Sequence, residues 1–230
     1  MQRLAIIPAR GGSKRIPKKN IKEFLGKPII SYAIKNAINS DLFDEVMVST
    51  EDIEIATISK SYGANIPFIR SSKTADDYAT TIEVISEVLN EYQKIGKTFN
   101  EACCIYPCTP LLQSNRLIES FKLLEKNSYD CVFPILRYGF PIQRAVRLNV
   151  FGKIEMIHPK HLITRSQDLE PSYHDAGQFY SFNVDKIILH KKLLTENTGY
   201  IELSEMEAQD IDNLTDWELA EIKYKIKNNK

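Results

Sequence analysis

A short basic loop near the start of the chain holds residue types suited to binding a polyphosphate. It follows the apolar run Leu4–Ile7 and reads PARGGSKRIPKKN from Pro8 to Asn20. Glycines let a backbone approach a ligand closely, and exposed N–H groups in such a loop can cradle phosphate oxygens. Arginine adds a planar fork of donors, and lysine adds a compact positive charge. The pattern matches neither GxGxxG nor the P-loop, so it indicates either a distinct anion-binding loop, which we favour, or an ordinary basic turn.

A pair of carboxylates near the other end of the chain has the chemistry of a metal site. Asp210 and Asp212 alternate about Ile211, so on an extended segment both carboxylates point the same way. Magnesium takes oxygen ligands and usually binds one or two carboxylates together with substrate phosphates. Taken alone, such a pair is more typical of a polar strand end or a helix cap. Beside a polyphosphate loop, it predicts a Mg²⁺ site.

Strand-like and helical patterns alternate along most of the chain and would position these residues. Strands are predicted at Leu4–Ile7, Val46–Thr50, Ala102–Tyr106, Cys131–Leu136 and Phe179–Asn183, with a short extended run at Ile66–Ile69. Helices are predicted at Ile29–Ile38, Ile53–Tyr62, Thr80–Tyr92, Leu117–Glu125, Val184–Leu194 and Thr215–Ile226, the last capped by Thr215 or Asn213. This rhythm predicts an α/β fold, a three-layer and mostly parallel open sheet with helices on both faces. In such sheets ligands bind at the carboxyl ends of the strands.

The rhythm breaks between residues 137 and 175. This stretch is polar, aromatic and β-prone without a helical period. We expect it to form a β-rich lobe inserted into a single domain that spans residues 1–230.

The charge balance excludes some classes of protein. The chain has 230 residues, with 30 basic and 30 acidic side chains and a formal net charge of zero, which argues against coating nucleic acid or a membrane. Residues 1–22 nevertheless carry seven basic side chains and no acid, whereas 193–222 carry nine acids and no Lys or Arg. Such segregation is either solvated surface or two halves of one site. No signal peptide, membrane span or paired-cysteine framework is evident, so we expect a cytoplasmic protein with reduced thiols.

These motifs together resemble the acylneuraminate cytidylyltransferases, enzymes that make CMP-activated sialic-acid-like sugars. The resemblance rests on the opening loop with GKPI at 26–29, FDEV at 43–46, VSTED at 48–52, YPCTPL at 106–111 and QDID at 209–212. The middle of the chain is similar to the branch that acts on pseudaminic acid, with FPIQRA at 140–145, TRSQDL at 164–169 and YHDAGQFY at 173–180. The resemblance implies a Rossmann-like nucleotide-diphospho-sugar transferase fold. It also implies a homodimer whose inserted lobe dimerises and reaches over the partner's site.

The resemblance also implies a reaction and the residues that perform it. CMP passes from CTP to the anomeric hydroxyl of a nine-carbon α-keto sugar acid, with Mg²⁺ as cofactor and pyrophosphate as the second product. The residues expected to bind the nucleotide are Ala9, Arg10, Gly11, Ser13, Lys14, Asn20, Arg70, Ala79 and Thr81. Lys19 and Arg10 would stabilise charge at the phosphates, and Asp210 and Asp212 would hold the metal. Asp212 is also a candidate to accept or orient the hydroxyl proton.

The acceptor is expected to be pseudaminic acid. Residues expected to bind it are Tyr106, Gln143, Arg165, Asp175 and Gln178, with Arg165 suited to a bidentate carboxylate contact. Many of the polar residues in this middle stretch would serve a dimer interface equally well. Tyr106 and Leu112 stand where the sialic acid enzymes have glutamine and arginine, which argues against N-acetylneuraminic acid. The alternatives are CMP activation of another nonulosonic acid or of 3-deoxy-octulosonic acid, and a nucleotide-sugar binding module without catalysis.

Overall fold

A seven-stranded sheet forms the centre of the computed structural model, which describes residues 2–228. Six strands follow the order β11-β6-β10-β5-β1-β4, and β9 pairs with the outer part of β6. Their bounds are β1 Arg3–Pro8, β4 Glu45–Ser49, β5 Glu101–Ile105, β6 Cys131–Arg137, β9 Tyr173–Asp175, β10 Phe179–Asn183 and β11 Thr198–Leu203. Pairs within the six are parallel except those of β10, which runs against β5 and β6. The predicted mostly parallel sheet is confirmed.

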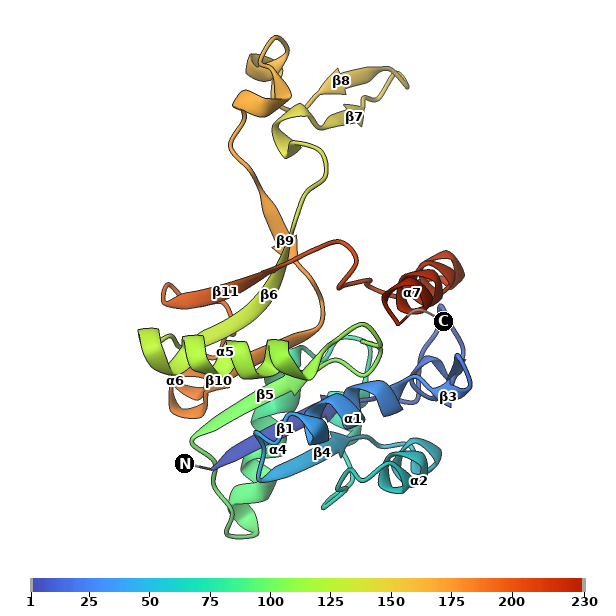
Figure 1. Cartoon of the computed structure of the whole chain (residues 1–230), viewed down its shortest axis with the longest axis vertical. Helices are drawn as coiled ribbons and strands as arrows, with labels where there is room; N and C mark the ends of the chain where they lie inside the picture. Colours follow the sequence, from blue (N-terminus) through green and yellow to red (C-terminus); the bar gives the residue numbers. More distant parts are fainter. Residues whose placement is uncertain (1, 229–230) are drawn as a thin grey trace.

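Helices cover both faces of this sheet, as the alternation of side chains along β1 requires. Ala5 and Ile7 face one layer and pack with α1 (Ile30–Asn39), α2 (Ile53–Ser61) and α5 (Ser114–Asn127). Leu4 and Ile6 face the other layer and pack with α4 (Thr81–Lys94) and α6 (Val184–His190). Figure 1 shows α1 and α5 in front of the sheet and α4 behind it. Within the described residues, no helix is long and apolar enough to cross a membrane.

The structure differs from the local predictions at three places. The run at Ile66–Ile69 is loop, next to a single bridge between Asn65 and Met47. Helix α6 ends at His190 rather than Leu194, because Lys191 adopts a left-handed conformation with φ of 52°. Strand β11 was not expected, although its residues alternate between buried and exposed as a half-buried strand should.

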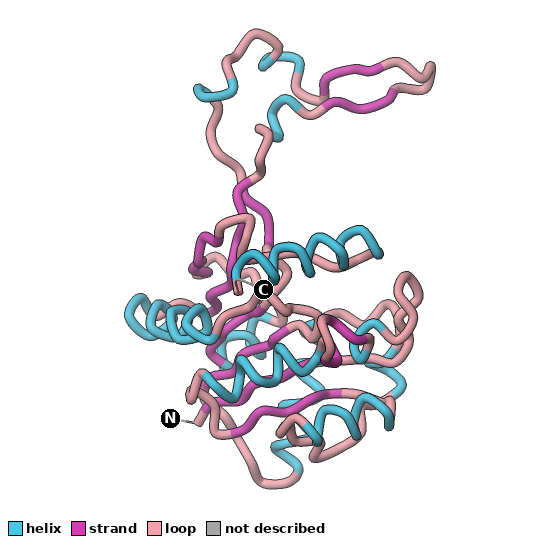
Figure 2. Tube along the Cα trace, turned by 45° about the vertical axis from the view of Figure 1, so that its right-hand side comes forward, coloured by secondary structure: helices cyan, strands magenta, loops and turns pink. Residues whose placement is uncertain are grey.

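The stretch from 137 to 175 projects from the body as a lobe. Strand β6 leads out of the body at Arg137, and β9 returns to it at Asp175 (Figures 1 and 2). Between them lie a hairpin of β7 (Val146–Leu148) and β8 (Ile154–Met156) and three 3₁₀ turns. Large apolar side chains of the lobe face outward, and Val150 and Ile163 are more than nine-tenths exposed. The lobe therefore has little apolar core of its own.

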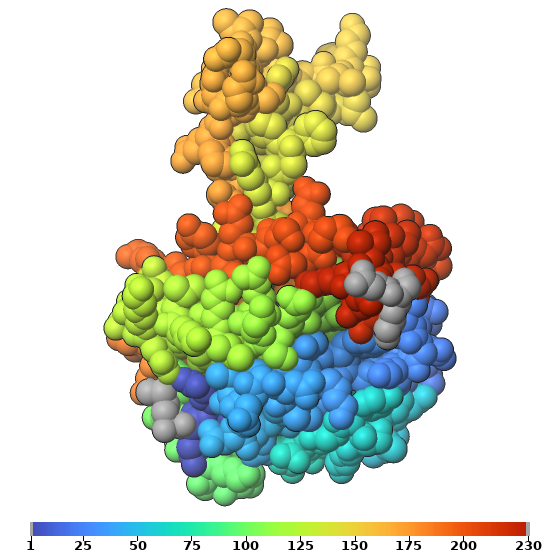
Figure 3. All heavy atoms as spheres, viewed as in Figure 1, coloured from blue at the N-terminus to red at the C-terminus, as the bar shows by residue number. Residues whose placement is uncertain are grey.

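The C-terminal helix packs on a hairpin from the N-terminal part of the chain. Helix α7 (Leu214–Lys227) packs on the hairpin of β2 (Glu23–Phe24) and β3 (Lys27–Pro28), and Figure 3 shows this C-terminal segment against the N-terminal one. The ring of Phe24 meets those of Trp217 and Tyr224 edge-on, with centroids 5.6 and 5.8 Å away. Asn213 caps the helix through a capping box, as one of the two predicted cap residues. This packing fixes the segment just before α7 beside the opening loop.

Candidate active site

One cleft of about 330 Å³ lies at the carboxyl ends of β1 and β5. Its walls come from residues 8–20, 70–84 and 106–108, and from Gly177 with 210–211. Seven of the nine residues predicted to bind the nucleotide line it: Arg10, Ser13, Lys14, Asn20, Arg70, Ala79 and Thr81. Lys19, Tyr106 and Asp210 line the same cleft. Segments far apart in sequence thus meet where an open α/β sheet places its ligands.

The other two predicted nucleotide residues shape the opening loop from behind. Ala9 is fully buried, and its N–H donates to the carbonyl of Ser49 at 2.9 Å. The N–H of Gly11 donates to Glu51 Oε1 at 2.7 Å. A Cβ on Gly11 would stand 2.6 Å from Asp52 Oδ2, so a larger residue here would force the Asp52 side chain, which caps α2, to shift. Neither residue lines the cleft, and both hold the loop against the end of β4.

Asn20 braces the loop at its far end. Its side chain is buried, and Nδ2 donates to the carbonyl of Arg10 at 2.8 Å. Its Oδ1 accepts from the Cys108 thiol at 3.3 Å, which ties the loop to the segment after β5. Burial raises the pKa of the Cys108 thiol to about 12, so this thiol stays protonated and donates. Cys108 is therefore a structural group of the cleft and not a nucleophile.

The basic loop and the acidic segment meet directly. Lys19 Nζ donates to the carbonyl of Ile211 at 2.8 Å, and Arg15 pairs with Asp212 at 2.7 Å. Ile211 is buried against Phe24 and the α7 core, which leaves the two aspartates flanking it on the side of the loop. The basic loop and the Asp210–Asp212 segment, far apart in the sequence, thus lie side by side at the cleft.

The two aspartates have different electrostatic surroundings. Burial raises the pKa of Asp210 above its usual value, and the nearby negative charge of Asp212 raises it further. The positive charge of Lys19 acts in the opposite direction and only partly compensates. Within residues 2–228, no set of three His, Cys, Asp or Glu side chains is arranged to hold a metal ion unaided.

Arg70, Ala79 and Thr81 form the opposite wall. Arg70 is buried, its N–H donates to the carbonyl of Thr50 at 3.0 Å, and burial lowers the pKa of its guanidinium. Thr81 begins α4, directly after the Thr80 capping box, and its hydroxyl lies 3.0 Å from the Tyr106 hydroxyl. Burial raises the pKa of Tyr106, so the phenol stays neutral. Tyr106 therefore connects the wall with Thr81 to the end of β5.

Two of the predicted sugar-binding residues lie just outside the cleft. Asp175 accepts hydrogen bonds from the Tyr180 hydroxyl and from the N–H of Gly177, the latter at 2.7 Å. Gln178 is buried, and its Nε2 donates to the carbonyl of Glu207 at 2.6 Å. Both side chains hold the cleft wall in place without lining it.

The other two lie in the lobe. Gln143 Nε2 donates to the carbonyl of Glu170 at 2.9 Å, and Arg165 pairs with Asp168 at 2.8 Å. Both partners belong to the lobe itself, and neither residue lines the cleft. Of the five residues predicted to bind the sugar, only Tyr106 borders the cleft within a single chain.

Sequence reasoning missed Asp77 and Arg15 as cleft residues. Asp77 pairs with Arg10 at 2.5 Å and with Lys14, so it contacts two of the residues predicted to bind the phosphates. Arg15 pairs with Asp212. Arg15 lies within the basic loop, but nothing in the pattern sets it apart from its neighbours. Asp77 is adjacent to Asp76 and close to Ala79, and no local signal shows that it faces a loop more than 60 residues away.

Comparison with known proteins agrees with this geometry. A family model described as cytidylyltransferase matches residues 4–224. The chain belongs to this cytidylyltransferase family. A pseudaminic acid cytidylyltransferase of Campylobacter jejuni is 41% identical over 98% of this chain and 97% of its own length. A CMP-N,N'-diacetyllegionaminic acid synthase of Legionella pneumophila is 31% identical over 96% and 95%.

A solved structure supports the fold of this cytidylyltransferase. A CMP:2-keto-3-deoxy-manno-octonic acid synthetase complexed with CTP superposes over the whole of both chains with a TM-score of 0.72 at 14% identity. That identity bears on the fold alone. The predicted resemblance to CMP-sialic-acid-type enzymes, and to the pseudaminic acid branch within them, is confirmed.

Proposed function

We propose that the protein transfers CMP from CTP to the anomeric hydroxyl of pseudaminic acid and releases pyrophosphate. The observation that carries this proposal is the meeting of the basic loop with the Asp210–Asp212 segment, marked by the 2.8 Å contact from Lys19 to the Ile211 carbonyl. A triphosphate needs several fixed positive charges, and an adjacent carboxylate pair would suit a divalent cation bound together with it. The pseudaminic acid cytidylyltransferase from Campylobacter supports the choice of acceptor.

Each wall of the cleft has a role in holding CTP. Arg10, Ser13 and Lys14 bind the phosphates, and Lys19 stabilises charge at the phosphate that is attacked. Arg70, Ala79 and Thr81 shape the cytidine side, while Asn20 keeps the loop in position for the nucleotide. Ala9 and Gly11 act through the backbone that they fix. Because Asn20 and the backbone of Ala9 and Gly11 are held in place before the substrate arrives, this part of the loop needs little reorganisation during the reaction.

Asp210 and Asp212 would hold Mg²⁺ together with the phosphates. The pair fits the ion chemically, because both ligands are oxygen atoms and the crowding that raises the pKa of Asp210 is relieved by a cation. When bound, the ion neutralises phosphate charge during transfer. In this proposal Asp212, which does not itself line the cleft and pairs with Arg15, exchanges that pairing and accepts or orients the proton of the attacking hydroxyl.

The acceptor site is completed by a second copy of the chain. The exposed apolar side chains of the lobe provide a surface for a homodimer. Gln143 and Arg165 of one copy then reach the cleft of the other, where Tyr106 borders the sugar. Asp175 and Gln178 support this side from behind. A cytoplasmic location fits the free, largely buried cysteines.

A pyrophosphate-release assay with a panel of sugar acids tests the proposal. Product is expected only when CTP, Mg²⁺ and pseudaminic acid are present together. The relative named for legionaminic acid makes that acid the second candidate. Turnover of legionaminic or N-acetylneuraminic acid without turnover of pseudaminic acid would overturn the acceptor and leave the reaction class. CTP binding without product from any acid would instead indicate a binding module.

A further inference from the structure

The carboxylate of Asp77 forms ion pairs with both Arg10 and Lys14 at the mouth of the cleft. Asp77 Oδ1 accepts from Arg10 Nη1 at 2.5 Å, and its Oδ2 accepts from Lys14 Nζ. Arg10 Nη1 also donates to the backbone carbonyl of Asp76 at 3.0 Å. Arg10, Lys14, Asp76 and Asp77 all line the cleft. The two basic groups best placed for phosphates are therefore already bound by an anion of the protein.

Asp77 lies in a short loop segment, residues 75–79 (the strap), and both ends of this segment are fixed. On one side, Ser71 and Thr74 bond to Glu87 of α4, and on the other, Thr80 caps the same helix. Between these anchors, Asp76 Oδ1 accepts from the N–H groups of Tyr78 and Ala79 at 2.9 and 2.7 Å. The strap from 75 to 79 thus carries Asp77 between the phosphate loop and the cytidine wall.

The contacts of Asp77 are weak enough to be exchanged. The side chains of Arg10, Lys14 and Asp77 are each a third or more exposed, and solvent screens ion pairs of this kind. Hydrogen bonds from Lys14 and Arg10 keep the pKa of Asp77 below its usual value, so the group is ionised at neutral pH. A polyphosphate entering the cleft must either displace this negative charge or be repelled by it.

We propose that Asp77 is a displaceable intramolecular competitor for the phosphates, and that it weakens the retention of pyrophosphate in the cleft. The proposal rests on the assignment of the cleft to CTP. When pyrophosphate leaves, the carboxylate returns to Arg10 and Lys14, so the departing product is replaced by an anion already in place. The same competition weakens the binding of CTP, because both ligands need the same two cations.

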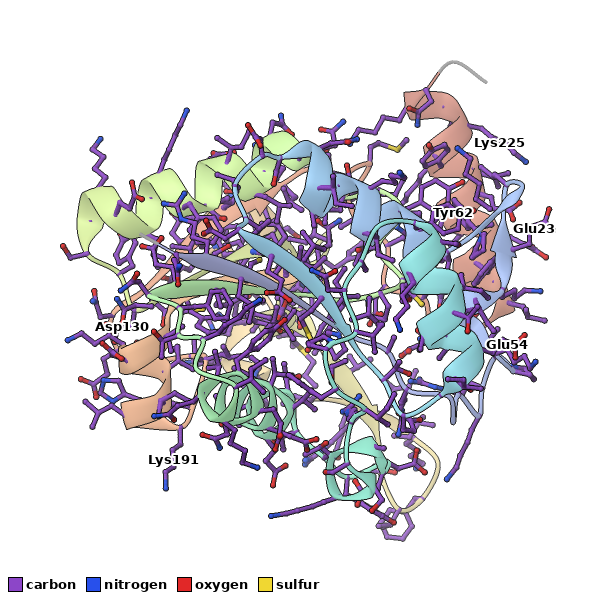
Figure 4. The ribbon with its side chains drawn as sticks, turned by 90° about the horizontal axis from the view of Figure 1, so that it is seen from below. Glu23, Glu54, Tyr62, Asp130, Lys191 and Lys225 are labelled. Carbon is purple, nitrogen blue, oxygen red and sulfur yellow. The ribbon has the colours of Figure 1, made fainter. Side chains whose placement is uncertain are left out.

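Calorimetric titration with inorganic pyrophosphate tests the competition directly. Asp77→Asn keeps the size of the side chain and removes its charge, so pyrophosphate is expected to bind about three- to tenfold tighter. Glu54→Gln is the matched control, because it makes the same charge change and breaks an ion pair of similar exposure with Lys18 at 2.5 Å. Glu54 lies on α2 (Figure 4), and neither it nor Lys18 lines the cleft. The control is expected to shift the affinity less than about twofold. In a Lys14→Met background, the effect of Asp77→Asn is expected to shrink.

Each remaining outcome overturns the proposal. Weaker pyrophosphate binding by Asp77→Asn would mean that the carboxylate positions Arg10 and Lys14 instead of competing for them. Equal shifts in Asp77→Asn and Glu54→Gln would reduce the effect to net charge. If wild type makes CMP-sugar but Asp77→Asn leaves pyrophosphate affinity unchanged, the competition is refuted and the proposed function stands. If none of the proteins binds pyrophosphate and wild type makes no product, the proposed function fails as well.

Discussion

The cleft and the lobe differ in how far one chain completes them. At the cleft, Lys19 and Asn20 contact partners from other segments, Gly11 is held from behind by Glu51, and Ile211 is buried behind the aspartates. In the lobe, the partners of Gln143 and Arg165 among residues 2–228 are Glu170 and Asp168 of the lobe itself, and apolar side chains such as Val150 face outward. The difference supports our proposal that a single chain carries the nucleotide half of the site, whereas the sugar half depends on a second copy.

The largest expected effect is loss of the lysine that joins the two halves of the cleft. Lys19→Ala is expected to lower kcat by about 10²- to 10³-fold, since it removes the fixed cation that we propose stabilises the reacting phosphate. The initial rate of pyrophosphate release measures this. Lys18→Ala is the matched control, because Lys18 is the preceding residue and does not line the cleft. Equal losses in both variants would refute a specific role for Lys19.

Asp210→Asn is expected to lower Mg²⁺-dependent turnover by about 10²-fold without destabilising the fold. The raised pKa of Asp210 means that the folded state binds its proton more readily than the unfolded state. Its ionised form therefore costs stability at neutral pH, and this cost disappears as pH falls below the ordinary range of aspartate. In ligand-free protein, the Tm of Asp210→Asn should be higher than that of wild type at pH 7 and equal to it in acid. A lower Tm at pH 7 would contradict this account.

Turnover of wild type should also fall in mild acid. Asp210 must be ionised to hold a cation, and its raised pKa means that protonation begins at a higher pH than for an ordinary aspartate. Excess Mg²⁺ competes with the proton, so it is expected to move the acid limb of the pH–rate profile to lower pH. If the acid limb of the pH–rate profile does not shift with Mg²⁺, the titrating group is not Asp210.

A substitution in the lobe should affect sugar turnover without affecting CTP binding. Phe151→Glu places a charge on an exposed apolar side chain, and it is expected to yield monomers and to reduce sugar turnover at least about tenfold. CTP affinity should change less than about twofold, because the cleft lies within one chain. Light scattering and calorimetry measure the two effects. Leu189→Glu on α6 is the control, as an exposed apolar residue of the body. Loss of CTP binding in Phe151→Glu but not in Leu189→Glu would contradict the claim that one chain binds the nucleotide without the lobe of another.

Tyr106→Phe should have the smallest effect. It removes only the hydroxyl that lies 3.0 Å from that of Thr81, so kcat/KM is expected to fall about two- to tenfold. Tyr200→Phe, at an exposed position on β11, should leave the rate unchanged. A loss above a hundredfold would instead give the Tyr106 hydroxyl a direct role in the reaction.

Local patterns predicted much of the fold because most elements have clear periodicity. Helix α4 begins one residue after the predicted start, and Asn213 caps α7 as one of two predicted residues. The antiparallel direction of β10 could not be read locally, because it is set by pairing with β5 and β6. The end of α6 depends on the left-handed conformation of Lys191, which is not a residue type that usually signals one.

The candidate site shows the same limit. The loop and the aspartate pair were visible because residue types and spacing mark them. The contact of Asp77 with Arg10 spans 67 positions, and the burial of Gln178 follows from how its segment folds back on Glu207. Such contacts arise only when distant segments pack together, so composition and spacing do not predict them.

Mixed dimers test most directly the claim that one copy supplies the nucleotide half and the other the sugar half. Lys19→Ala inactivates the cleft and leaves the lobe intact, whereas Arg165→Ala does the reverse. Each variant alone should be nearly inactive in pyrophosphate release with pseudaminic acid. After the two are mixed and reassociated, about a quarter of wild-type activity is expected, because half of the dimers then contain one intact site. A mixture no more active than the average of its two components would contradict the claim.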